Sequence, residues 1–322
     1  MADTPSPAKN TRKPSRRGPI LVAAGAAGWG TEGLWRFRLD QRLAPYPIVL
    51  LEHLLQVIWT LPWLMKNFWL LRRRAVPMRA FWWVLLSGGL GSSLGTVCYT
   101  AAYATDVNKT AAAVLLNLQP VVSTIAASLL FGERIRKRFY PWAILAVLAG
   151  CMMAVDTPGR EMFAGLKLSA GFGYIGATIV LWGFATVAGR GAMRELPLGL
   201  AAPLRLWAGL LTTAVVLGLR VLAGKGGIAM APLHEWRVWV DLLLLTTVSG
   251  SLPLFIYFAG LKTTPAALAG YCEMFYTVTG SVIAWAFLGG KLAPHQIAAG
   301  LVLVGAIVML NRVGAVEGGE RA

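Results

Sequence analysis

Apolar segments of about 20 residues alternate with short polar connections along most of the chain. A helix of about 20 apolar residues is long enough to cross a lipid bilayer. We therefore predict an all-α polytopic membrane protein with ten transmembrane helices, and the connections leave no room for a sizeable soluble domain. The ten predicted spans are residues 19–39, 46–66, 81–104, 109–131, 139–156, 166–188, 198–221, 237–258, 265–288 and 293–311.

The fourth predicted span has polar residues near its middle and a basic cluster after its end. Asn117, Gln119 and Pro120 interrupt an otherwise apolar run, which stops at Gly132-Glu133 before the four cations of residues 134–138. A proline removes a backbone hydrogen bond, and lipid tolerates this only where neighbouring groups or a wet cavity satisfy the freed carbonyl. The stretch therefore predicts an interrupted helix with a polar midpoint.

Composition supports the membrane class. The chain is 57% hydrophobic and 14% charged, whereas soluble domains carry about 25% charged residues. The formal net charge of +16 would suggest nucleic-acid binding in a soluble protein. Here the cations lie between apolar segments, where the positive-inside rule explains them. We therefore predict a lipid bilayer and a small-molecule substrate as partners, and no nucleic acid.

The distribution of Lys and Arg predicts the orientation of the chain. Residues 1–18, 66–79 and 134–138 are rich in these cations and fall on the same side as both termini. Cytoplasmic loops carry an excess of Lys and Arg. We predict a multi-pass protein of the bacterial cytoplasmic membrane with both termini in the cytoplasm. Residues 1–18 are expected to form a disordered basic tail, and residues 312–322 a short cytoplasmic tail.

Short motifs recur between the two halves of the chain. The matches are Ser93-Leu94, Tyr99, Ala101 and Thr105 with Ser251-Leu252, Tyr257, Ala259 and Thr263; Trp29-Gly30 with Trp182-Gly183; and residues 131–134 with residues 288–291. They predict a first five-helix repeat over 19–156 and a second over 166–311. Because five spans is an odd number, the second repeat must enter the membrane inverted. Inverted repeats are typical of secondary transporters, which bind substrate near the midplane between the halves.

These motifs, in this order, resemble the EamA branch of the drug/metabolite transporter superfamily. The resemblance rests on Trp29-Gly30, the segment from Tyr99 to Thr105, Leu118-Gln119-Pro120, Phe131-Gly132-Glu133-Arg134, and the later half from Tyr257 through Leu310. It implies a ten-helix exporter or permease for small organic metabolites. The second half departs from the pattern, with Gly290 at the position of Glu133 and Thr277 at the position of Pro120.

Among the ionisable residues inside predicted spans, four qualify as candidates for function, with His53 and Arg36 beside them: Glu32, Glu52, Arg205 and Glu273. Each costs about 2.5–3.5 kcal/mol on insertion scales, so such groups normally face the bundle interior or water. The repeat aligns Glu52 with Arg205, with Glu52 in the outer half of the membrane and Arg205 in the inner half. Our hypothesis is that both line a central pathway and that Arg205 favours an anionic group such as a carboxylate.

A purely structural role is the alternative for these charges. Glu32 stands four residues before Arg36, so the two can form an ion pair on one helix face. For Glu52, Arg205 and Glu273 the sequence leaves a helix–helix ion pair and a pathway role open. His53, whose imidazole can exchange a proton near neutral pH, and Glu32 are candidates for proton coupling.

Further pathway candidates are polar or aromatic residues deep in the predicted spans. They are Asn117, Gln119, Trp29, Trp182, Tyr99, Tyr257 and Tyr276. Asn117 and Gln119 are two residues apart, so one could line the cavity while the other bonds a neighbouring helix. For each aromatic residue, packing is the competing interpretation.

The predicted function is secondary transport, as an exporter of a small organic metabolite such as an amino acid or a related amphipathic compound. The alternative is a membrane-embedded enzyme acting on a lipid or prenyl substrate. Such an enzyme needs clustered carboxylates or a Ser–His–Asp set, and the sequence shows neither spacing; it also lacks a GxxxxGK[ST] motif for ATP. We therefore predict no enzyme activity, no cofactor and no metal, and leave a homodimer open.

Overall fold

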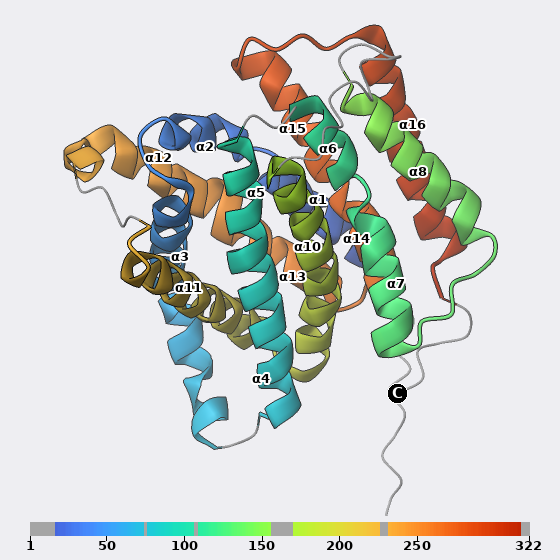
Figure 1. Cartoon of the computed structure of the whole chain (residues 1–322). Helices are drawn as coiled ribbons and strands as arrows, with labels where there is room; N and C mark the ends of the chain where they lie inside the picture. The colour runs from blue at the N-terminus through green and yellow to red at the C-terminus, as the bar shows by residue number, and fades with distance from the viewer. Residues whose placement is uncertain (1–16, 74–75, 106–108, 156–169, 226–230, 317–322) are drawn as a thin grey trace, which may run out of the picture.

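The structure is a computed structural model that describes residues 17–73, 76–105, 109–155, 170–225 and 231–316 (Figure 1). Its elements are helical, apart from one isolated antiparallel bridge between Ile135 and Val316. The first half contains α1 (Arg17–Trp29), α2 (Gly33–Asp40), α3 (Pro45–Arg72), α4 (Met78–Leu85), the π-helix η1 (Leu86–Gly95), α5 (Thr96–Tyr103), α6 (Lys109–Leu116), α7 (Gln119–Phe131) and α8 (Phe139–Met153). The second half contains α10 (Ala170–Glu195), α11 (Leu198–Leu222), the 3-10 helix η2 (Ala231–His234), α12 (Trp236–Thr246), the π-helix η3 (Thr247–Ser251), α13 (Leu252–Leu261), α14 (Ala266–Glu273), α15 (Phe275–Phe287) and α16 (Pro294–Val313).

These elements form the ten predicted segments and confirm the all-α polytopic fold. Seven helices of the described chain are long and apolar enough to cross a membrane, and α8 is a shorter apolar helix. Two of the seven contain a π-helical stretch, because α4, η1 and α5 run on as one helix, as do α12, η3 and α13. A π-helical turn widens a helix locally and often occurs at functional sites. Both stretches are at corresponding places in the two halves.

The first predicted span is wrong as a continuous helix, because the chain breaks between α1 and α2. At the break, the Thr31 hydroxyl donates to the carbonyl of Gly28 over 2.7 Å and lies 2.7 Å from the Ser249 hydroxyl. Gly30 packs so closely on α15 that an added Cβ would lie 2.7 Å from the carbonyl oxygen of Tyr276. Local side-chain hydrogen bonds and this close contact hold the interruption.

The ninth predicted span is also wrong as a continuous helix. Residues 266–287 are interrupted at Met274, between α14 and α15, although Thr277 stands where the first repeat has Pro120. A hydrogen bond from the Thr277 hydroxyl to Oδ1 of Asn117, 3.1 Å long, joins this interruption to the one between α6 and α7. The sixth span extends further than predicted, because α10 continues to Glu195.

Helices of the two repeats pack in pairs that mirror each other. Helix α1 lies along α13, and α10 lies along η1 and α5; α3 lies along α11, α7 along α14, and α8 along α16. Helices α7 and α15 both end before a glycine with positive φ, Gly132 at 63° and Gly289 at 72°. A left-handed residue is a common helix terminator. The two five-segment repeats therefore share local geometry, run in opposite directions and interleave around a common centre.

Candidate functional site

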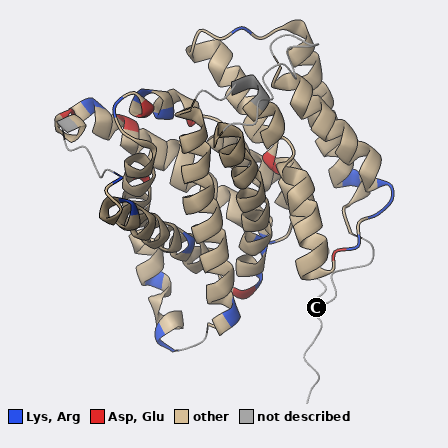
Figure 2. Ribbon diagram, viewed as in Figure 1, with Lys and Arg blue, Asp and Glu red and all other residues tan. Residues whose placement is uncertain are grey.

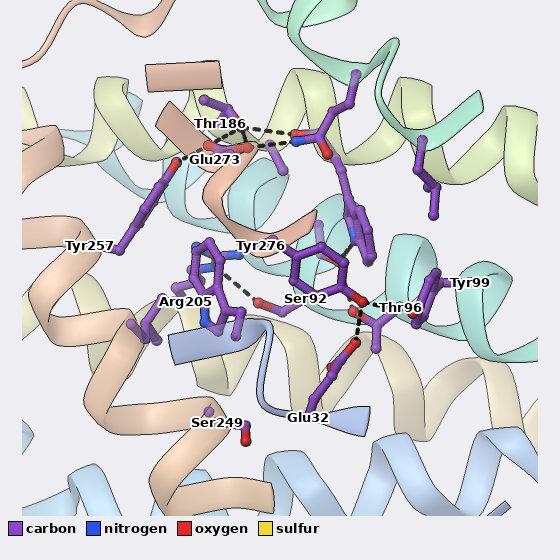
Figure 3. A pocket seen from close by; sticks show the side chains of 18 of the residues that line it. Glu32, Ser92, Thr96, Tyr99, Thr186, Arg205, Ser249, Tyr257, Glu273 and Tyr276 are labelled. Carbon is purple, nitrogen blue, oxygen red and sulfur yellow. Dashed lines mark hydrogen bonds between the residues drawn. The ribbon is translucent and has the colours of Figure 1, made fainter. Parts of the chain in front are cut away.

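A cavity of about 180 Å³ lies between the two repeats (Figure 3). Its wall includes all twelve residues that the sequence proposed for the pathway or for coupling. These are Trp29, Glu32, Glu52, His53, Tyr99, Asn117, Gln119, Trp182, Arg205, Tyr257, Glu273 and Tyr276. The structure adds polar residues that the sequence did not single out, namely Gln56, Ser92, Thr96, Thr186, Ser249 and Thr277.

The helix interruptions place polar groups in the wall. Asn117 sits at the break between α6 and α7 and donates to the carbonyls of Ala113 (2.9 Å) and Gly150 (3.2 Å). Gln119 begins α7, and Glu273 ends α14 at the matching break. Asn117 therefore both lines the cavity and bonds the neighbouring α8, and Gln119 faces the cavity as well.

Arg36 joins two carboxylates at one side of the cavity. Its Nη2 lies 3.2 Å from Oε2 of Glu32 and 3.0 Å from Oε2 of Glu52. The residue is 5% exposed, and Nη1 also donates to the Thr100 hydroxyl over 3.4 Å. The ion pair between Glu32 and Arg36 that the sequence offered as a structural alternative is present, and it extends to Glu52. The Arg36 guanidinium is therefore fixed in place by its ion pairs with Glu32 and Glu52 and by its hydrogen bond to Thr100.

Two tyrosines of different repeats meet beside this ion-paired group. The Tyr276 hydroxyl donates to Oε1 of Glu32 over 2.9 Å, and the hydroxyls of Tyr99 and Tyr276 are 2.7 Å apart. Tyr99 also lies against Trp182, with 5.2 Å between ring centroids. Tyr99 and Tyr276 thus connect the repeats across the cavity wall.

Glu273 lies at the opposite side and accepts hydrogen bonds from three side chains (Figure 3). The donors are the Tyr257 hydroxyl at 2.5 Å, the Thr186 hydroxyl at 2.8 and 3.1 Å, and Nε2 of Gln119 at 2.6 Å. They come from α13, α10 and α7, so both repeats hold this carboxylate. Charge-assisted hydrogen bonds are shorter and stronger than neutral ones. The oxygen atoms of Glu273 are therefore fixed in place within the cavity.

Arg205 has different surroundings from Arg36. Its Nε donates to the Ser92 hydroxyl over 2.9 Å, and its guanidinium carbon lies 5.2 Å from the centre of the Phe258 ring. Among the described residues no carboxylate lies within 4 Å of this guanidinium. Glu52 and Arg205, aligned by the repeat, face one cavity from the paired helices α3 and α11 without forming an ion pair. The Arg205 guanidinium thus lines the cavity, and the Glu273 carboxylate is a charged neighbour beyond ion-pair distance.

His53 is packed tightly in the wall beside Glu52. Its Nδ1 lies 2.7 Å from the carbonyl oxygen of Val49, and within the described part of the chain Nε2 has no hydrogen-bond partner. An added Cβ on Gly209 would lie 2.5 Å from the imidazole, so α11 presses against this ring. A role for His53 or Glu32 in proton coupling stays a prediction.

A larger hollow of about 770 Å³, here called the vestibule, adjoins the cavity. It shares Glu32, Arg36, Tyr99, Leu116, Tyr276 and Thr277 with the cavity wall. Its remaining lining includes α2, the second half of α15 and the start of α16, at the upper end of the molecule in Figure 1, with further residues from α5, α6 and α8. The cavity therefore has a neighbouring space toward one end of the helix bundle, which suits the entry or exit of a ligand.

Two repeats with a substrate site between them are a common architecture among membrane transporters. The chain belongs to the EamA-like transporter family, whose model matches residues 16–155 and 170–312. It is therefore a multi-pass membrane protein with a small-molecule substrate and belongs to no enzyme family. The membrane-enzyme alternative is set aside on that ground.

Two individual proteins resemble the whole chain. The chain is 26% identical over 304 residues to the riboflavin transporter ImpX of Fusobacterium nucleatum subsp. nucleatum, covering 92% of this chain and 98% of that protein. It also superimposes on a protein of known crystal structure with a TM-score of 0.70 and 17% identity, covering 93% of this chain and 99% of the other. The second likeness supports the fold alone.

Proposed function

We propose that this protein is a secondary carrier that exports a small organic metabolite, such as an amino acid or a related amphipathic compound, by alternating access between its two repeats. The observation that carries the proposal is the Arg205 guanidinium, which faces the cavity without a carboxylate partner among the described residues. A guanidinium offers a planar fork of donors that suits a carboxylate. A substrate carboxylate would form the direct ion pair with Arg205 that no described residue of the protein forms.

The rest of the cavity suits the remainder of such a substrate. The fixed oxygens of Glu273 can accept from an ammonium group, and the aromatic faces of Trp29 and Trp182 can pack on an apolar part. Trp29 lies against Tyr257 with 4.7 Å between ring centroids, so its position is held by packing. A few placed polar groups in a mostly apolar wall are typical of small-molecule sites.

A flavin-type compound is a second candidate, favoured by the likeness to a riboflavin transporter. Flat aromatic rings pack well in offset or edge contacts with Trp and Tyr. The carbonyl oxygens of the flavin ring could accept from Arg205 in place of a carboxylate. The two candidates differ in their charged groups, because an amino acid carries a carboxylate and an ammonium group and riboflavin carries neither.

The proposed orientation places both termini in the cytoplasm of a bacterial cell. Lys and Arg gather at the lower end of α3, at the start of α4 and along residues 134–138 (Figure 2). At the opposite end two cations have acidic partners on or next to α12, because Arg38 lies 3.1 Å from Asp241 and Arg42 pairs with Glu235. The clusters of Lys and Arg at the lower end support a cytoplasmic assignment. The vestibule would then open outward.

A ligand-stabilisation screen on the purified chain tests the substrate. A ligand that binds the native state raises the apparent melting temperature by mass action. We expect stabilisation by an amino acid or by riboflavin, followed by counterflow of the same unchanged molecule in proteoliposomes. Recovery of a chemically altered product would overturn the carrier proposal.

Gel filtration with light scattering on the same preparation measures the oligomeric state and so tests whether a homodimer forms.

Labelling of single cysteines in intact cells tests the orientation. Arg136→Cys should react with an impermeant maleimide only after lysis, and Arg42→Cys should react before it. Reaction of Arg136→Cys in intact cells would reverse the proposed topology.

A further inference from the structure

The end of the bundle opposite the vestibule is held by a carboxylate that crosses between the repeats. Glu133 is 4% exposed, and its Oε1 and Oε2 accept hydrogen bonds from the backbone N–H groups of Ala266 (3.1 Å) and Ala267 (3.2 Å). These are the first two residues of α14. Glu133 follows the last residues of α7 in the first repeat, whereas α14 belongs to the second.

Such a contact is physically favourable. The first N–H groups of a helix have no partner within the helix, and a negative charge near this end is stabilised by the helix dipole. Pro265, the residue before α14, supplies no side-chain cap. The carboxylate of Glu133 therefore satisfies the start of the helix whose last residue is Glu273, in the cavity wall.

The second repeat lacks this group. Gly132 and Gly289 have matching positive φ values and follow the ends of α7 and α15, so Glu133 corresponds to Gly290. Gly290 lines the open vestibule. The helix that corresponds to α14 is α6, which begins at Lys109. The end with the carboxylate has the fully buried Thr264, whereas the end with glycine at the matching position borders the vestibule.

We infer that Glu133 is a positioning residue for transport, which latches α7 to α14 and holds the gate at this end shut. Opening the cavity toward this end separates α7 from α14 and breaks both hydrogen bonds to Glu133. Closing the vestibule end by the corresponding motion forms no such pair, because Gly290 has no side chain. The inference rests on the proposed alternating-access function and adds the residue that makes its two gates unequal.

Other contacts close the same end but do not join the two interrupted helices. Arg190 of α10 donates through Nη1 to the carbonyls of Leu261 (2.9 Å) and Lys262, all within the second repeat. The backbone N–H of Arg136 donates to the carbonyl of Ala315 over 3.0 Å, beyond the end of α16. Glu133 alone among these three connects α7 and α14, the helices that carry Gln119 and Glu273 into the cavity.

Cysteine accessibility on the purified full chain tests the latch without any substrate. In a background lacking Cys98, Cys151 and Cys272, one reporter is Thr264→Cys, at a fully buried position two residues before α14, and the other is Ser281→Cys in the vestibule. An impermeant maleimide should label the vestibule reporter quickly and the buried reporter slowly. Glu133→Gln should raise the labelling rate at position 264 about tenfold, equivalent to about 1.4 kcal/mol, and lower it at position 281.

Two further variants keep the test decisive. Glu195→Gln removes another carboxylate from this end, one paired with the largely exposed Arg79, and should leave both labelling rates unchanged. Glu133→Asp keeps the charge on a shorter side chain and should give an intermediate rate, and it carries the test if Glu133→Gln does not fold. Wild-type rates at both reporters in a folded Glu133→Gln or Glu133→Asp protein would overturn the latch.

The reporters also separate this inference from the proposed function. If counterflow in proteoliposomes returned no solute or an altered one, the carrier proposal itself would fail, whatever the labelling rates at positions 264 and 281. If the wild type is closed at position 264 and Glu133→Gln leaves it closed, the carrier proposal stands and the latch alone is overturned.

Discussion

Arg36 and Arg205 face the same cavity from different repeats, yet their surroundings differ. Arg36 lies within 3.2 Å of two carboxylates, whereas Arg205 has the Ser92 hydroxyl and the Phe258 ring as its neighbours. A buried charge that loses its partner is costly, while a buried charge without a protein partner can be met by a ligand. We therefore expect Arg36 to stabilise the fold and Arg205 to bind the substrate.

The largest expected effect is the loss of stability in Arg36→Ala. Removal of this cation leaves Glu32 and Glu52 buried close together without a counter-charge, and breaking a buried ion pair typically costs about 3–5 kcal/mol. The apparent melting temperature of the purified protein measures it. Arg42→Ala is the matched control, because Arg42 and Glu235 form an ion pair in which both side chains are exposed, by 37% and 52%; exposed pairs contribute about 0–1 kcal/mol. Equal effects of both substitutions would contradict the assignment.

Arg205→Ala should have the opposite profile. Transport efficiency should fall about 100-fold, which corresponds to roughly 2.7 kcal/mol, because a substrate acceptor loses its charged partner. The melting temperature without substrate should fall far less than in Arg36→Ala, because Arg205 has no carboxylate within ion-pair distance and interacts with Glu273 only over a longer range. Arg220→Ala is the control on the same helix, because Arg220 lies over the Tyr46 ring at 4.1 Å, away from the cavity. If Arg205→Ala lowered the melting temperature as much as Arg36→Ala does, Arg205 would have the same structural role as Arg36.

Tyr257→Phe tests whether the carboxylate opposite Arg205 must be fixed for binding. The substitution removes the 2.5 Å hydrogen bond to Glu273 and leaves the donors from Thr186 and Gln119. Substrate affinity should fall about tenfold, since a hydrogen bond to a charged group is worth about 1.5–3 kcal/mol. Tyr271→Phe is the control, because Tyr271 packs on Phe139 outside the cavity. Unchanged substrate affinity in Tyr257→Phe would contradict the prediction that the hydrogen bond from Tyr257 to Glu273 contributes to substrate binding.

Ser92→Ala should give the smallest effect. The Ser92 hydroxyl accepts one hydrogen bond of 2.9 Å from Nε of Arg205 and so orients this guanidinium. Loss of this bond should lower the affinity for substrate about fivefold, or about 1 kcal/mol. Ser87→Ala on the same helix serves as the control, because within the described residues the Ser87 hydroxyl has no hydrogen-bond partner. Isothermal titration with the substrate identified by the screen compares the two variants. A larger loss in Ser87→Ala would show that α4–η1 packing, rather than Arg205 orientation, is being measured.

The sequence predicted the scaffold well because the underlying signals are long and repetitive. Apolar segments of about 20 residues and motifs that recur in register specify ten helices and a duplication. The residues of the cavity wall could be proposed because charges inside an apolar span have few stable positions. Thus Glu52, Arg205 and Glu273 all lie in the cavity wall.

Two kinds of feature were beyond reach of the sequence. The interruption at Met274 has no proline, and it coincides with a contact between Thr277 and Asn117 that joins residues 160 positions apart. Ser92 and Thr186 are common residue types, and their role is visible only from their hydrogen bonds, because Ser92 accepts from Arg205 and Thr186 donates to Glu273. Thr186 does lie one turn after Trp182, and Ser92 precedes a repeated Ser-Leu motif, but packing alone would explain both positions. Long-range hydrogen bonds, unlike helix periodicity, leave no local pattern.

Glycine at position 290, where the other repeat has Glu133, bears on the energetics of uptake and release. A carrier without an energy source of its own must obey microscopic reversibility, because the free energy of a full cycle depends only on the solute and any coupled ion. A latch at one gate therefore cannot make the carrier accumulate more solute on either side. It changes instead the fraction of empty carriers that face each side, and so the apparent half-saturation concentration on each face. Glu133→Gln should move these two constants in opposite directions and leave the steady-state concentration ratio unaltered.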